Sequence, residues 1–175
     1  YVQVRIANAY RRSALELRRT APEDATGDGA RAEASTRLEH AATAYARVLE
    51  SLQGAPADPT NDELMRLSML YRADCLHDLG TPESLKAALA QYQAIATRLE
   101  GTPAALTAYV QIARVQLRQG ELAAAARSLE RARWLLKGLP DRAFGPDPQR
   151  ERSEWEQFFE VTLSSTLFQG ALASR

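Results

Sequence analysis

The chain has 175 residues, of which 45% are hydrophobic and 25% charged, a composition ordinary for a globular protein. Its 22 basic residues balance 22 acidic residues, so a nucleic-acid partner is not expected, and no run approaches the roughly eighteen apolar residues of a membrane span. A single domain over 1–175 is the default for this length, because such a chain is able to bury about 70% of its unfolded surface.

The first predicted helix pair covers residues 1–53. Apolar residues recur every three or four positions over 1–19 and again over 31–52, the period of a helix with one buried face. Between them, 20–29 combines proline, glycines and acids without this period, which predicts a loop. The chain opens on this helical pattern without a methionine or a signal-like run, so we expect it to be a piece of a longer protein.

The second predicted pair covers 62–100. Thr60 with Glu63 matches a capping box, in which two side chains satisfy free backbone amides at a helix start. A wide apolar stripe follows and stops at Gly80, which suits the left-handed conformation in which helices often end.

A threonine followed by a proline occurs twice, at Thr81-Pro82 and at Thr102-Pro103. A threonine hydroxyl is able to cap a helix, and proline suits the first turn because its missing N–H costs nothing there. The two signals predict the start of the second helix of the second pair and of the first helix of the third.

The third predicted pair covers 103–137 and has the clearest pattern in the chain. Its apolar period stops at Gly120 and resumes directly afterwards, which predicts two helices joined by a tight turn. The small residues Ala113 and Ala125 are expected to meet where the helices cross, because a methyl group allows the two axes to approach closely.

A terminal helix is predicted over 148–169, after the start signal Asp147-Pro148. We expect it to cover the last hydrophobic face of the helix pairs. Its apolar stripe consists of Trp155, Phe159, Leu163 and Leu167.

The third pair carries a recognisable set of aromatic, aliphatic and small residues: Tyr109, Ile112, Ala113, Ala125, Leu129 and Ala132. This set resembles a tetratricopeptide repeat, with Gln116 where tyrosine is usual and Pro140 a few residues late. The resemblance implies an all-α fold, a short right-handed α-solenoid of about three irregular helix pairs with a C-terminal capping helix.

In proteins of this family the concave surface is lined mainly by the first helix of each pair, and partner peptides bind there. The resemblance therefore implies a groove built from residues of three helices. These groove candidates are Asn8, Arg11, Arg12, Tyr71, Asp74, His77, Asp78, Gln111, Arg114 and Arg118. One subset of the family grips a C-terminal carboxylate with lysines, but here the lysines are missing and Asp74 adds a negative charge.

Catalytic chemistry has little support in the sequence. Asp74 and His77 lie within one helical turn and suit a metal or a proton transfer, but the alternative is a solvated polar face. Cys75, the only cysteine, cannot form a disulfide within the chain and is expected to be a small buried residue, and it leaves the cellular compartment open. Phosphate loops and nucleophile elbows are absent from the sequence, so we expect no enzyme, metal or cofactor.

The sequence favours a protein-interaction module that binds a partner protein or peptide in the concave groove. The alternative is a structural segment that packs against another domain or forms a homodimer through Trp155, Phe158 and Phe159. The expected state is a monomer or a weak homodimer, and an enzyme centred on Asp74 and His77 is a third reading.

Overall fold

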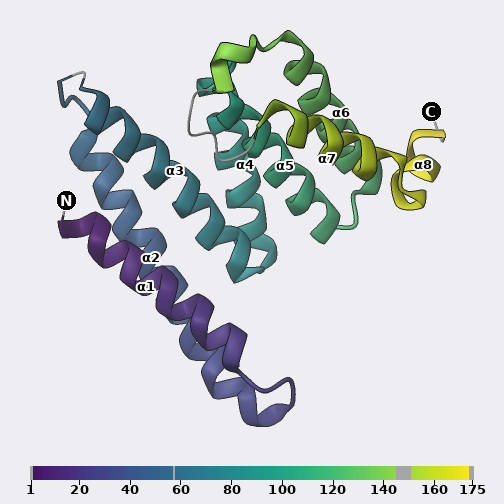
Figure 1. The fold of residues 1–175 in the computed structure, drawn as a ribbon. Coiled ribbons are helices and arrows are strands. Elements are labelled where there is room, and N and C mark those ends of the chain that lie inside the picture. Colours follow the sequence, from purple (N-terminus) through teal and green to yellow (C-terminus); the bar gives the residue numbers. More distant parts are fainter. Residues whose placement is uncertain (1, 57, 145–150, 174–175) are drawn as a thin grey trace. The chain divides into compact units, whose positions relative to one another are not determined.

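The computed structural model describes residues 2–56, 58–144 and 151–173, and all of the regular structure in these ranges is helical (Figure 1). The predicted all-α fold class is therefore confirmed. Within the same ranges, every helix is too short or too polar to cross a membrane. The elements, with η for a 3-10 helix, are α1 (Val2–Thr20), η1 (Ala25–Gly27), α2 (Asp28–Leu52), α3 (Pro59–Leu79), α4 (Pro82–Arg98), α5 (Pro103–Arg118), α6 (Leu122–Gly138), η2 (Asp141–Phe144), α7 (Arg152–Ser164) and α8 (Thr166–Ala173).

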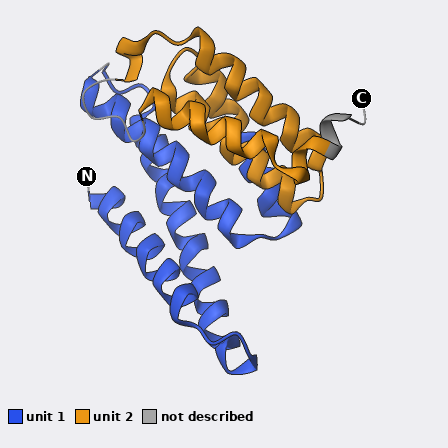
Figure 2. Ribbon diagram, turned by 45° about the vertical axis from the view of Figure 1, so that its right-hand side comes forward, with its two compact units in different colours: residues 1–91 blue, residues 92–175 orange. Residues whose placement is uncertain are grey.

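The chain divides into two compact units, residues 1–91 and 92–175, with the boundary inside α4 (Figure 2). The apolar side chains Leu85, Ala88, Tyr92 and Ile95 of α4 are buried, and Leu99, directly after the helix, is partly buried. The grouping of all helices into one repeat domain stays a prediction.

Unit 1 contains α1, α2 and α3, and α2 packs against both of the others. Most of the buried side chains between these helices are alanines, which allow helix axes to approach closely. Cys75 has no exposed surface, as expected for a small buried residue. The buried cluster consists of Ala7, Ala14, Ala34, Leu38, Ala41, Ala42, Ala44, Tyr45 and Cys75.

In unit 2, α5 packs against α6, and both α7 and α8 pack on α6. Three aromatic rings of α7 lie together: Trp155 stacks on Phe159 with centroids 5.6 Å apart, and Phe158 meets Phe159 edge-on at 5.2 Å. The buried cluster that joins these helices consists of Leu106, Ala113, Ala125, Ala126, Leu129, Ala132, Leu136, Leu139, Phe144, Trp155, Phe159, Leu163 and Phe168.

The turn between α5 and α6 confirms the predicted stop at Gly120, whose φ is 78°. The amide of Glu121 donates to the Gln116 carbonyl at 2.8 Å, and the amide of Gly120 donates to the Leu117 carbonyl at 3.0 Å. These two bonds form a Schellman motif. One further bond crosses the helix pair, because the Ser128 hydroxyl donates to the Gln116 side-chain oxygen at 2.7 Å.

The predicted capping box at the start of α3 is wrong. Asp58 is the N-cap, its carboxylate accepts from the Thr60 amide at 3.3 Å, and Pro59 is the first helical residue. A carboxylate is a strong cap because it also stabilises the positive end of the helix dipole. Glu63 instead pairs with Arg66 at 2.5 Å on the helix surface.

The two threonine-proline signals differ in their capping bonds. At the start of α4, the Thr81 hydroxyl oxygen accepts from the Ser84 amide at 3.1 Å, so this cap is confirmed. At the start of α5, the Thr102 hydroxyl instead donates to the Leu99 carbonyl at 2.8 Å and makes no side-chain cap. The prolines that follow are the first residues of both helices, as predicted.

The single terminal helix predicted over 148–169 is wrong, because Ser165 has an extended backbone, with ψ of 147°, and separates α7 from α8. The break changes the face that the following residues present. Leu167, expected in the apolar stripe, is 54% exposed, and Phe168 is buried in its place.

The predicted start signal Asp147-Pro148 lies outside the described residues. Within them, α7 begins at a capping box in which Glu151 and Glu154 each accept from the other's backbone amide.

Overpacking the α5–α6 crossing should destabilise the protein. We expect Ala113→Leu or Ala125→Leu to lower the free energy of unfolding by about 1 to 3 kcal/mol, because both methyl groups are buried between the helices. The matched control is Ala123→Leu at an exposed position of α6, and this substitution should change the free energy of unfolding by less than about 0.5 kcal/mol. Urea unfolding measures the free energy of unfolding of the three variants, and equal values would contradict this packing.

Candidate functional site

The groove candidates fall into both units, with those from α1 and α3 in unit 1 and those from α5 in unit 2. In unit 1 an ion pair joins two of them across helices. Arg11 of α1 lies 3.2 Å from the Asp74 carboxylate of α3, with side chains only 23% and 19% exposed. The same guanidinium lies 4.7 Å from the centre of the Tyr71 ring, a cation-π contact. Arg11 therefore ties α1 to α3.

A second tie in unit 1 joins α1 to α2. The buried Tyr45 hydroxyl donates to the Asn8 side-chain oxygen at 2.5 Å, and the Tyr45 and Tyr71 rings lie 5.8 Å apart. Burial raises the pKa of the Tyr45 phenol, so it keeps its proton and remains a donor. Asn8 thus stabilises the contact between α1 and α2.

The remaining unit 1 candidates vary in exposure. Arg12 is exposed and donates to the Asn8 backbone carbonyl at 3.4 Å. His77 is nearly buried, with Nδ1 3.4 Å from an Asp78 carboxylate oxygen. Arg18 donates to the backbone carbonyl of Asp78. Of these three contacts, the Arg18 bond joins α1 to α3, the Arg12 bond lies within α1, and the His77–Asp78 contact lies within α3.

Asp74 and His77, the pair expected for metal or proton-transfer chemistry, each have another charged neighbour. The Asp74 carboxylate lies 3.2 Å from Arg11, and His77 Nδ1 lies 3.4 Å from an Asp78 carboxylate oxygen. Across the part of the chain that the structure describes, no group of three or more histidine, cysteine or acidic residues is placed to hold a metal ion.

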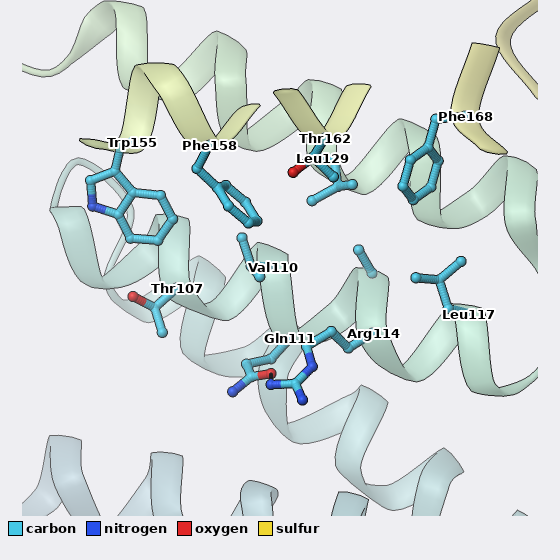
Figure 3. A pocket seen from close by; sticks show the side chains of 11 residues that line it. Thr107, Val110, Gln111, Arg114, Leu117, Leu129, Trp155, Phe158, Thr162 and Phe168 are labelled. Atoms are coloured by element: carbon cyan, nitrogen blue, oxygen red, sulfur yellow. Dashed lines mark hydrogen bonds between the residues drawn. The ribbon is translucent and has the colours of Figure 1, made fainter. Parts of the chain in front are cut away.

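In unit 2, two of the three candidates line a pocket of about 470 Å³, and we call it the α5–α7 pocket (Figure 3). Gln111 and Arg114 lie side by side on α5, with Arg114 donating to the Gln111 side-chain oxygen at 3.2 Å. Arg118, one turn further along α5, is exposed and is not among the lining residues. The described lining residues are Thr107, Val110, Gln111, Ala113, Arg114, Leu117, Leu129, Trp155, Phe158, Thr162 and Phe168.

The helix packing explains why this pocket exists. Because α7 and α8 pack on α6, their aromatic side chains lie beside α5. The open space between these side chains and α5 is the pocket. Figure 3 shows Trp155 and Phe158 extending from α7, and Val110 of α5 lying opposite them. Trp155 and Phe168 are buried, Val110 and Phe158 are partly buried, and the result is a mostly apolar hollow.

A hollow in unit 1 is larger, at about 670 Å³, but is a weaker candidate. It lies between α1 and α2 and includes Ser13, Glu33 and Arg37. Arg37 pairs with Glu33 at 2.8 Å and donates to the Ser13 hydroxyl at 2.8 Å. These polar groups already bind one another.

The sequence pattern does not predict the aromatic half of the α5–α7 pocket. It predicts a dimer contact for Phe158 and no role for Val110. A signal was nevertheless present, because Val110, Arg114 and Leu117 have the spacing that places them on one face of α5.

Comparisons of the chain with protein-family models, with curated proteins and with solved structures found no match. The fold and the site define an all-α protein with an apolar pocket beside an arginine.

The Arg11–Asp74 pair should stabilise unit 1. A double-mutant cycle with Arg11→Met and Asp74→Asn should give a coupling free energy of roughly 1 to 2 kcal/mol, between the values of exposed and fully buried pairs. The matched control is the exposed Glu16–Arg19 pair, which should couple less. Urea unfolding supplies the free energies, and a coupling no larger than that of the control would rule out this role.

Cys75 should make stability depend on alkaline pH. Burial raises its thiol pKa from the ordinary 9.0 to about 12, so above about pH 9 unfolded chains lose a proton that folded chains keep. The free energy of unfolding should therefore fall as pH rises, by about 1 kcal/mol from this group between about pH 8 and about pH 10. Urea unfolding of wild type and Cys75→Ala at both values isolates this contribution, and equal pH dependence in the two proteins would refute it.

Proposed function

We propose that the chain is a protein-interaction module of tetratricopeptide-like helix pairs, and that a segment of a partner protein binds in the α5–α7 pocket. The proposal includes the right-handed solenoid expected from the resemblance. Its support is local to unit 2, where four of the six residues that carry the resemblance, Ala113, Ala125, Leu129 and Ala132, are buried in one cluster. Gln116, where the repeat pattern has tyrosine, bonds to α6 instead.

The observation that carries the proposal is the apolar lining of the pocket. Its volume of about 470 Å³ lies within the range of roughly 300 to 1,000 Å³ that is usual for binding sites. Aromatic side chains such as Trp155 and Phe158 are enriched where proteins bind one another. Leu117 at the pocket edge is 37% exposed, so a partner side chain placed there would remove apolar surface from water.

Binding in this pocket accounts for the unit 2 geometry better than the other readings. A homodimer through Trp155, Phe158 and Phe159 would need these side chains at the surface. Trp155 and Phe159 are instead buried within unit 2, with 7% and 0% exposure. We assign no catalytic role to Asp74, because Arg11 engages its carboxylate.

Light scattering at high micromolar concentration distinguishes the dimer from the interaction module. We expect the mass of a monomer, 19.3 kDa, because little of the aromatic cluster is left to bury. A mass twice as large that returns to the monomer value in Phe158→Ala would favour the dimer instead.

Capture of partners tests the proposed function. Leu117 and Leu15 are both 37% exposed on helices, but only Leu117 lines the pocket, so Leu117→Gln and Leu15→Gln form a matched pair. We expect wild type and Leu15→Gln to retain the same proteins from a lysate of the source organism, and Leu117→Gln to lose them. Proteins retained equally by all three would place recognition elsewhere, and no retained protein would favour a structural role.

A further inference from the structure

The α5–α7 pocket has an uneven distribution of charge. Among its eleven described lining residues, Arg114 carries the only charge, and no carboxylate is present. The guanidinium is exposed and, within the described part of the chain, binds the Gln111 side-chain oxygen. A guanidinium has five N–H donors, so this single bond leaves donors for a second acceptor.

The surroundings of Arg114 determine which acceptor suits it. Val110 and Leu117 lie on the same face of α5, four residues before and three residues after it, and both line the pocket. A ligand that reaches Arg114 therefore also contacts apolar side chains. An arginine fork matches the two oxygens of a carboxylate, and such charge-assisted bonds are stronger than neutral ones.

The length of the pocket indicates a chain segment as the ligand. Its α5 residues extend from Thr107 to Leu117, ten residues along a helix, which correspond to about 15 Å. An extended peptide covers this length with about five residues. An aliphatic or aromatic side chain has Trp155, Phe158 and Leu129 as apolar neighbours.

We propose that the α5–α7 pocket binds a short segment of a partner protein in which an aspartate or glutamate lies next to aliphatic or aromatic residues. The acidic side chain binds Arg114, and its apolar neighbours occupy the space between α5 and α7. This inference rests on the proposed function and adds the chemistry of the partner segment.

Selection from random peptides displayed on phage tests this specificity with the full chain. The peptides are fused at their carboxyl end, so the acid comes from a side chain and not from a chain terminus. Selections use wild type, Arg114→Gln and Arg127→Gln, where Arg127 is an exposed arginine of α6 outside the pocket. Both substitutions remove one positive charge, so a difference between them reports position and not net charge.

We expect wild type and Arg127→Gln to enrich peptides with an acid beside apolar residues, and Arg114→Gln to lose the preference for the acid. The most enriched peptide is then synthesised with blocked ends, together with a version in which the acid is changed to its amide, and fluorescence anisotropy measures the affinity of both. The amide should bind wild type about tenfold more weakly than the acid, or by about 1.4 kcal/mol. For Arg114→Gln the two peptides should differ by less than about twofold.

Two outcomes would overturn the inference, and they are distinguishable. Enriched peptides without an acid, or an acid preference that persists in Arg114→Gln, would refute the role of Arg114 while leaving a peptide-binding module. If wild type enriches no peptide, the proposed function itself fails, and the inference fails with it.

Discussion

Close packing of small residues where α5 crosses α6 is the constraint on which the form of unit 2 depends. Ala113 of α5 and Ala125 of α6 are buried in the same cluster, and methyl groups allow the axes of packed helices to approach closely. Helix α7 packs on α6, and its aromatic rings Trp155 and Phe159 belong to the same buried cluster. One face of α5 consequently lies beside these rings without being covered by them, and this is the α5–α7 pocket.

The groove candidates of the two units have different surroundings. In unit 1, Arg11 binds Asp74 and Tyr71 between helices, and Asn8 accepts from Tyr45, so the groove candidates there make contacts within the unit. Removing one partner of such a pair leaves a partly buried charge or polar group, which is costly. In unit 2, the polar residue Arg114 lies beside apolar side chains. We therefore propose that unit 1 supports the fold and that recognition takes place in unit 2.

Local signals made the helices predictable, whereas contacts between distant residues were not. Gly120 ends α5 through bonds to the preceding turn, so the sequence around it was sufficient. The break at Ser165 interrupts an apolar period without glycine or proline, so it was missed. Arg11 and Asp74 are 63 positions apart, and helical periodicity does not predict such pairs. Likewise, the place of Phe158 in the pocket depends on how α7 packs on α6.

The chain contains two tryptophans, and they provide the most direct test of recognition in the pocket. Trp155 lines the pocket, whereas Trp134 is 63% exposed on α6, outside it. Both are replaced by 5-fluorotryptophan, and ¹⁹F NMR spectra are recorded as a selected acidic peptide is added. If the peptide binds in the pocket, the Trp155 resonance should shift with peptide concentration while that of Trp134 does not. A shift of Trp134 alone would contradict recognition in the pocket.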